Sequence, residues 1–218
     1  MRTIAFVSQG GGSGKSTIAS SLAVAAHEMS ERVSVIDMDP QNSLTHWSRI
    51  RGLCEIDVIA SGAAGLPALL ASLERKGVTL AILDAPGAEG AASSAAMQVA
   101  DLNIVPSRPS MFDLRGSART RAALEEIGAE FVFLLNQCQP GQQTACVQDA
   151  VEALQEMGEL ISPLILTRAD YQEAARRGRG ATELNPRGAA AAEIRDLWQS
   201  IKRRPARAKV RQPAGKAA

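Results

Sequence analysis

The feature that most restricts the fold of this chain is a glycine-rich segment placed directly after a short apolar run near the N-terminus. The apolar run covers residues 3–8, and residues 10–17 read Gly-Gly-Gly-Ser-Gly-Lys-Ser-Thr. Glycines adopt backbone angles that turn successive N–H groups toward one point, and a helix beginning at the lysine adds the positive end of its dipole. We therefore expect a strand, an anion-binding loop and a helix, in this order.

The residue types at the end of this segment predict how a nucleoside triphosphate would be held. Lys15 would reach the β- and γ-phosphates, the Ser16 hydroxyl would ligate Mg²⁺, and Thr17 would donate to the α-phosphate. The expected nucleotide-binding residues of the segment are Gly10, Gly11, Gly12, Ser13, Gly14, Lys15, Ser16 and Thr17.

Beyond the loop, short β-branched runs alternate with longer stretches of helical periodicity. This alternation predicts an α/β fold with a mainly parallel twisted sheet flanked by helices, and together with the phosphate-loop motif it predicts a single-domain P-loop NTPase. A hydrophobic content of 45% with only 3% aromatic residues suits small side chains packed between helices and a sheet. Strands are expected at 3–8, 33–37, 79–84, 102–105, 131–135 and 160–166, with a further apolar run at 56–59, and helices at 15–29, 44–50, 66–76, 113–127, 144–157, 171–177 and 189–203.

Charge is distributed unevenly along the chain. The net charge is +1, but seven basic and no acidic residues occur from residue 202 onward, which leaves the preceding part at about −6. We expect one domain over residues 1–201, followed by a basic, disordered tail over 202–218. The tail is either simply solvated or an arm that binds a polyanion.

The sequence predicts a cytoplasmic protein without a membrane partner. The three cysteines show no C-x-x-C spacing, which disfavours a metal or redox motif. The N-terminus has no secretion signal, and no apolar run reaches the roughly 18 to 20 residues of a membrane-spanning helix.

Acidic residues stand at the ends of two apolar strands. Asp37 and Asp39 are separated by one residue, and Asp84 ends the most apolar run. Side chains at i and i+2 of an extended chain share a face, and the carboxyl ends of parallel strands form the ligand-binding edge of a sheet. The three carboxylates are therefore expected near the phosphate loop.

These motifs resemble the ParA/MinD family of ATPases over most of residues 1–201. The family's loop reads K-G-G-x-G-K-[ST]-T, and residues 37–41 (Asp-Met-Asp-Pro-Gln) and 84–87 (Asp-Ala-Pro-Gly) are similar to its D-x-D-P-Q and D-x-P-G segments. The resemblance implies ATP and ADP as ligands, Mg²⁺ as the metal, and ATP hydrolysis.

The resemblance also implies roles for single residues. Lys15 and Asp39 are the expected catalytic residues, Asp39 because its counterpart orients the attacking water. Ser16, Asp37 and Asp84 are the expected metal-site residues, with Asp84 acting through water. Asn136, after the run 131–135, is expected to contact adenine.

The loop departs from the family motif at its first lysine, which in the family crosses a nucleotide-sandwich dimer. Gly10 occupies that position, and Gln9 stands where an ordinary phosphate loop has its first glycine. We therefore expect slow intrinsic hydrolysis, because a cation facing the phosphoryl group matters by orders of magnitude. Whether Arg108 or a residue of the 176–179 group replaces the lysine is left open.

Residues 100–113 resemble small ParF-like plasmid-partition ATPases, and ParA-type proteins bind DNA through C-terminal basic residues. The implied function is an ATP-dependent partition or positioning ATPase: a nucleotide-sandwich homodimer that binds DNA nonspecifically on the nucleoid and is stimulated by a ParB-like or centromere-binding partner. The expected DNA-binding residues are Arg168, Arg176, Arg177, Arg179, Arg187 and Arg195.

Two other functions stay open at this point. One is a nucleotide-gated scaffold with little hydrolysis that positions a protein cargo such as a carboxysome or a chemoreceptor array. The other is a metabolic ATP-dependent ligase of the same fold, which would be indifferent to DNA. ATP-dependent, salt-sensitive retention of DNA would exclude the ligase.

Overall fold

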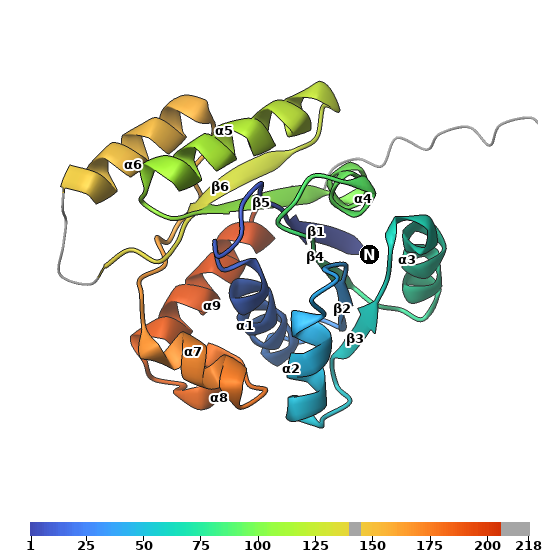
Figure 1. Cartoon of the computed structure of the whole chain (residues 1–218). Helices are drawn as coiled ribbons and strands as arrows, with labels where there is room; N and C mark the ends of the chain where they lie inside the picture. The colour runs from blue at the N-terminus through green and yellow to red at the C-terminus, as the bar shows by residue number, and fades with distance from the viewer. Residues whose placement is uncertain (140–144, 206–218) are drawn as a thin grey trace, which may run out of the picture.

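The computed structural model describes residues 1–139 and 145–205, which form three layers, with helices on both faces of a central sheet (Figure 1). In this part of the chain the sheet has six strands, all parallel, in the order β3-β2-β4-β1-β5-β6. The strands are β1 (Arg2–Phe6), β2 (Val33–Asp37), β3 (Asp57–Ala60), β4 (Leu80–Asp84), β5 (Leu102–Ser107) and β6 (Phe131–Leu135). The expected parallel α/β fold is confirmed.

The helices divide between the two faces of the sheet, and each group encloses its own apolar cluster. One side carries α1 (Lys15–Glu28), α2 (Ser43–Arg51), α7 (Ala169–Arg176), α8 (Ala181–Leu184) and α9 (Ala189–Lys202). The other carries α3 (Leu66–Arg75) with the short 3₁₀ turn Ala63–Gly65 before it, α4 (Ala91–Val99), α5 (Met111–Glu126) and α6 (Ala145–Met157).

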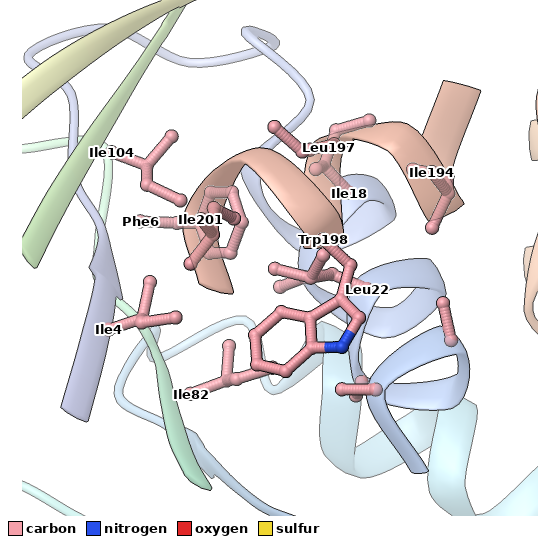
Figure 2. Close-up of a cluster of buried hydrophobic side chains, with 14 of the residues drawn as sticks. Ile4, Phe6, Ile18, Leu22, Ile82, Ile104, Ile194, Leu197, Trp198 and Ile201 are labelled. Carbon is pink, nitrogen blue, oxygen red and sulfur yellow. The ribbon is translucent and has the colours of Figure 1, made fainter. Parts of the chain in front are cut away.

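The two clusters arise from the alternation of side chains along the buried strands. Along β1 and the residue that follows it, Ile4 and Phe6 belong to the cluster beneath α1 and α9, whereas Ala5 and Val7 belong to the cluster on the opposite face. Figure 2 shows Trp198 of α9 packed among apolar side chains of α1 and of the central strands. The site is therefore built on the buried central strands of the sheet, whereas β3 at one edge stays partly exposed.

The register of the sheet brings the sequence motifs together. Phe6 pairs with Asp84 across β1 and β4, and Asp37 pairs with Asp84 across β2 and β4. The glycine-rich loop that follows β1 and the acidic residues that end β2 and β4 therefore lie at the same edge of the sheet. As expected, this is the carboxyl edge, where ligands of open α/β sheets bind.

The prediction of a strand at 160–166 is wrong. This segment lies along β6 but makes only two isolated bridges, Phe133 with Leu160 and Cys138 with Leu166. The backbone N–H of Ile161 donates to Phe133, but the next donor in the ladder would be Pro163, which has no N–H. The carbonyl of Leu135 accepts from Ile165 instead, and the regular ladder is lost.

Other boundaries differ in smaller ways. The sequence analysis missed α4 and α8, because α4 is rich in alanine and serine and α8 is a single turn. Residue 144, the expected first residue of α6, lies outside the described part. The boundary set before residue 202 falls inside α9, and Arg204 forms ion pairs with Glu130 and Glu159, so residues 202–204 belong to the folded part. Residues 206–218 of the predicted tail lie outside the described residues. Among the described helices, none is long and apolar enough to cross a membrane.

Candidate functional site

The loop between β1 and α1 has the glycines its conformation requires. Gly12 and Gly14 have φ of +80° and +90°, a region that L side chains rarely adopt. A Cβ on Gly14 would lie 2.3 Å from Nδ2 of Asn136. Gly14 is also the N-cap of α1, so the loop runs directly into the N-terminus of this helix, where free backbone N–H groups can bind an anion.

A cleft of about 780 Å³ opens beside the loop, in the size range of ligand pockets in proteins. Its wall is formed by the loop, the first turns of α1, one side of α2, and the segments after β2, β4 and β6. The lining residues include Gly11, Gly12, Gly14, Lys15, Ser16, Thr17, Asp39, Pro40, Gln41, Trp47, Gly87 and Gln137. Gly10 and Ser13 of the predicted set line a second hollow, between the loop and the start of α5.

Lys15 is the cation at the centre of the cleft and is only 7% exposed. Its Nζ donates to Oγ of Ser8 at 3.0 Å and to the carbonyl of Gly10 at 3.4 Å. Burial lowers the pKa of Lys15, while the carboxylates of Asp84 and Asp39 oppose this shift. The ammonium is thus held over the loop, where an anion would replace neutral oxygens as its partner.

Ser16 and Asp84 form a pair of oxygen donors suited to Mg²⁺. The Ser16 hydroxyl donates to Oδ2 of Asp84 at 2.6 Å. Burial raises the pKa of Asp84 to about 7, although Ser16 and Lys15 act in the opposite direction. Oδ1 of Asp84 is buried and has no hydrogen-bond partner among the described residues. A buried carboxylate with a free oxygen fits a cation held largely by water and phosphate, as Mg²⁺ commonly is.

The described residues contain no cluster of three or more histidine, cysteine, aspartate or glutamate side chains that could hold a metal alone. A metal at Ser16 and Asp84 would therefore need oxygens from the nucleotide and from water. This requirement agrees with a site that binds Mg²⁺ together with a triphosphate.

The two acids after β2 occupy different positions. Asp37 is buried, and its Oδ2 accepts hydrogen bonds from the backbone N–H and the hydroxyl of Thr45, at 2.8 and 2.9 Å. Asp39 lines the cleft, and its Oδ1 accepts from the N–H of Gln41 at 2.9 Å. Asp37 thus fixes the first turn of α2, whereas Asp39 faces the space beside Lys15. The metal role of Asp37 and the water-orienting role of Asp39 stay predictions.

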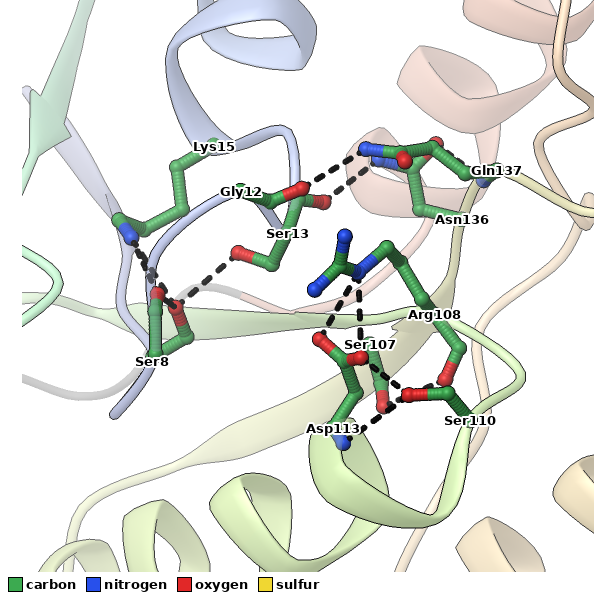
Figure 3. Close-up of polar contacts among 11 residues, drawn as sticks. Ser8, Gly12, Ser13, Lys15, Ser107, Arg108, Ser110, Asp113, Asn136 and Gln137 are labelled. Atoms are coloured by element: carbon green, nitrogen blue, oxygen red, sulfur yellow. Dashed lines mark hydrogen bonds and ion pairs between the residues drawn. The ribbon is translucent and has the colours of Figure 1, made fainter.

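Asn136 lies beneath the loop (Figure 3). Its Nδ2 donates to the carbonyl of Ser13 at 2.7 Å, and its side chain does not line the cleft. The neighbouring Gln137 does line it, and donates through Nε2 to the carbonyl of Gly12 at 2.9 Å. The contact of Asn136 with adenine stays a prediction, and Gln137 is a cleft residue that the sequence analysis missed.

A network that the sequence analysis also missed joins α2 to residues 178–183, which follow α7 and include the start of α8. The side chain of Arg51 is 2% exposed and forms ion pairs with Glu55 at 2.5 Å and Glu183 at 2.7 Å. It also donates to the carbonyl of Gly178 and packs over the ring of Trp47. No spacing in the sequence indicates this network, because Arg51 and Glu183 are 132 residues apart.

The six arginines expected to bind DNA are placed on and around α7, α8 and α9. Arg176, Arg177, Arg179 and Arg187 are exposed, whereas Arg168 and Arg195 are partly buried. Three of the six are ion-paired: Arg168 with Glu193, and both Arg176 and Arg177 with Glu173. Arg195 donates to the carbonyl of Pro186. The structure gathers these residues in one region of the fold, and their binding to DNA stays a prediction.

Comparisons with known proteins agree with this geometry. Residues 4–181 match the family described as the CobQ/CobB/MinD/ParA nucleotide binding domain. The chain is 35% identical over 162 residues to the maintenance of carboxysome distribution protein A of Gloeobacter kilaueensis, covering 72% of this chain and 71% of that protein.

Two solved structures share the fold. The ATP complex of a Cyanothece McdA variant has a TM-score of 0.74 at 20% identity, over 93% of this chain and 95% of that one. The septum site-determining protein MinD of Pyrococcus horikoshii, complexed with Mg-ADP, has a TM-score of 0.72 at 19% identity, over 93% and 96%. By its phosphate loop, its sheet and the family match, this chain belongs to the CobQ/CobB/MinD/ParA family of P-loop nucleotide-binding proteins.

Proposed function

We propose that this protein is an ATP-dependent positioning ATPase of the ParA/MinD type. The observation that carries the proposal is that Lys15 and Ser16 line one cleft at the carboxyl edge of the sheet, with the buried Asp84 hydrogen-bonded to Ser16 behind them. The site supplies a cation for phosphate and two oxygen donors for Mg²⁺, and its walls are built by segments that can respond to the bound nucleotide.

In this proposal, different residues of the site bind the phosphates, hold the metal and orient the attacking water. Backbone N–H groups of residues 10–17 and the ammonium of Lys15 would bind the phosphates, and Ser16 and Asp84 would hold Mg²⁺. When bound, Mg²⁺ neutralises charge on the β- and γ-phosphates. Asp39 would accept a hydrogen bond from the attacking water.

The segment after β4 is joined directly to the loop, which supports a role in sensing the nucleotide. The N–H of Gly10 donates to the carbonyl of Gly87 at 2.9 Å, and a Cβ on Gly87 would come within 2.9 Å of the carbonyl oxygen of Gly10 and 3.3 Å of Nζ of Lys15. A change in the loop on phosphate binding would therefore move Gly87 as well.

In this proposal ATP closes a homodimer, the dimer binds DNA nonspecifically through the C-terminal arginines, and a partner protein stimulates hydrolysis. The exposed side chains of Arg176, Arg177, Arg179 and Arg187 support the DNA step. The similarity to a carboxysome distribution protein favours a protein body over a plasmid as the cargo.

The test compares the native protein with Lys15→Ala. Calorimetry should show Mg²⁺-dependent uptake of ADP by the native chain and at least about a tenfold loss in the variant, because a charge-assisted phosphate contact is removed. Retention of random-sequence DNA should need ATP and fall steeply with salt. Absence of nucleotide uptake by the native chain would refute the proposal.

A scaffold with little hydrolysis is the second candidate, and Gly10 at the position of the family's lysine favours it. The two functions separate in a turnover assay with saturating DNA. A nucleotide-dependent DNA complex that persists for hours without phosphate release would support the scaffold, whereas steady phosphate release would support the ATPase.

A further inference from the structure

Arg108 is a second cation beside the phosphate loop, next to Gly12 and Ser13 (Figure 3). It follows β5, and its Nη1 lies 3.5 Å from the position that a Cβ on Gly12 would take. The residue does not line the cleft but lines a hollow of about 220 Å³ between the loop and the start of α5, together with Gly10, Gly11 and Phe112. Arg108 therefore is not part of the wall that would surround a nucleotide bound in the cleft of its own chain.

The guanidinium of Arg108 is held in place through its Nε atom. Nε of Arg108 donates to both carboxylate oxygens of Asp113, at 3.0 and 3.1 Å, and Asp113 is in turn held by Ser110, the N-cap of α5. Neither Nη atom makes a hydrogen bond to a described residue, and the side chain remains 41% exposed. An arginine fixed through Nε with two free terminal nitrogens is preorganised to bind an anion that arrives from outside.

The surroundings of Arg108 favour another protein surface rather than bulk solvent. Met111 and Phe112, in the first turn of α5, are 75% and 85% exposed, and Phe112 shares the hollow with Arg108. Gly11 lines both this hollow and the nucleotide cleft, so the two openings adjoin. A surface that covers the cleft would also cover Arg108 and Phe112.

We propose that Arg108 binds the triphosphate held by a second copy of this chain, across a dimer interface that includes Phe112. The inference rests on the proposed function, because it needs a nucleotide-bound dimer. In a two-fold symmetric dimer each Arg108 would reach the nucleotide of the other subunit, so each site is complete only in the dimer. Arg108 thus supplies the cation that the loop lacks at position 10.

The structure offers a rescue experiment. A Cβ on Gly10 meets nothing within 4 Å, and Gly10 does not have a positive φ, so Gly10→Lys is sterically allowed. If Arg108 only braces the loop through Asp113, a lysine at position 10 cannot replace it. If Arg108 acts through its charge across the interface, Gly10→Lys restores the dimerisation that Arg108→Met weakens.

Dimerisation is measured by sedimentation velocity with Mg²⁺ and ATPγS, and the dissociation of a fluorescent ATP analogue gives a second readout. Arg108→Met should raise the dimer Kd by about 10- to 100-fold and speed nucleotide release from the dimer, because a charge-assisted contact is lost in each site. Nucleotide affinity of the monomer should change by less than about twofold. Arg75→Met, which removes an exposed arginine at the C-terminal end of α3, is the matched control and should behave as the native chain.

The outcomes are distinct. Recovery of dimerisation in Gly10→Lys/Arg108→Met, or in the conservative variant Arg108→Lys, supports the inference. Native dimerisation of Arg108→Met overturns it, as does a loss that neither lysine restores while circular dichroism shows a folded chain. A native chain that binds nucleotide but stays monomeric also overturns it, and a native chain that binds no nucleotide overturns the proposed function itself.

Discussion

Replacing Arg51 by methionine should destabilise the protein strongly, although Arg51 lies outside the nucleotide cleft. Methionine keeps most of the side-chain volume over Trp47 but removes the ion pairs with Glu183 and Glu55 and the hydrogen bond to the carbonyl of Gly178. Removing one partner of a buried ion pair costs about 3–5 kcal/mol. Because Glu183 and Glu55 remain 25% and 30% exposed, water can partly restore their solvation, and we expect about 3 kcal/mol.

The effect should be measured by urea unfolding and by thermal melting at neutral pH. A loss of about 3 kcal/mol corresponds to about 6 to 12 °C for a domain of this size. Arg49→Met, an exposed arginine on the same helix, is the control and should change stability by less than about 0.5 kcal/mol. A change of this small size in Arg51→Met as well would refute the conclusion that α2 is clamped to residues 178–183.

The clamp also predicts a pH dependence. Burial raises the pKa of Glu183, but hydrogen bonds from Arg51 and Gly180 outweigh burial, and the pKa is lowered from its ordinary value of 4.5. A lowered carboxylate pKa stabilises the fold above the unfolded value, and this contribution is lost as the pH falls through the folded value. The stability difference between the native chain and Arg51→Met should therefore shrink below pH 4.5.

Three further predictions concern the loop, the metal site and the core. Gly14→Ala should abolish nucleotide binding in calorimetry and lower the free energy of unfolding by about 2 kcal/mol or more. The reason is that φ of Gly14 is +90° and the new Cβ would clash with Asn136. Normal nucleotide binding by this variant would contradict the loop geometry. Because burial raises the pKa of Asp84 to about 7, the nucleotide-free protein should lose stability as the pH rises from about 4 to 7. Above pH 7, Asp84→Asn should be more stable than the native chain by up to about 4 kcal/mol, yet it should bind Mg-nucleotide poorly. Equal melting curves of the two proteins at pH 8 would contradict the raised pKa. Trp198→Ala should cost about 3–5 kcal/mol in urea unfolding, since the indole is buried between α9 and the sheet, and a loss below about 1 kcal/mol would show that the layer is loosely packed.

The sequence predicts best those parts of the site that local chemistry determines. The loop and the acids after β2 and β4 follow from glycine content, apolar runs and the geometry of parallel strands, and the structure places them at one edge. The network of Arg51 could not be predicted, because its partners come from distant segments and no local pattern records their meeting. The segment 160–166 was misread for a related reason: its composition is that of a strand, but the ladder fails at the one residue without an N–H.

The position of α9 has a practical consequence for anyone who wishes to express only part of this protein. The recognisable family region ends at residue 181, but α9 begins at Ala189 and contributes Trp198, Leu197 and Ile201 to the cluster against β1 and β4. A chain cut after residue 181 would leave this apolar face uncovered and should aggregate rather than yield a smaller folded protein. The shortest form worth purifying therefore runs at least through Arg204, whose ion pairs fasten the end of α9 to the residues that flank β6.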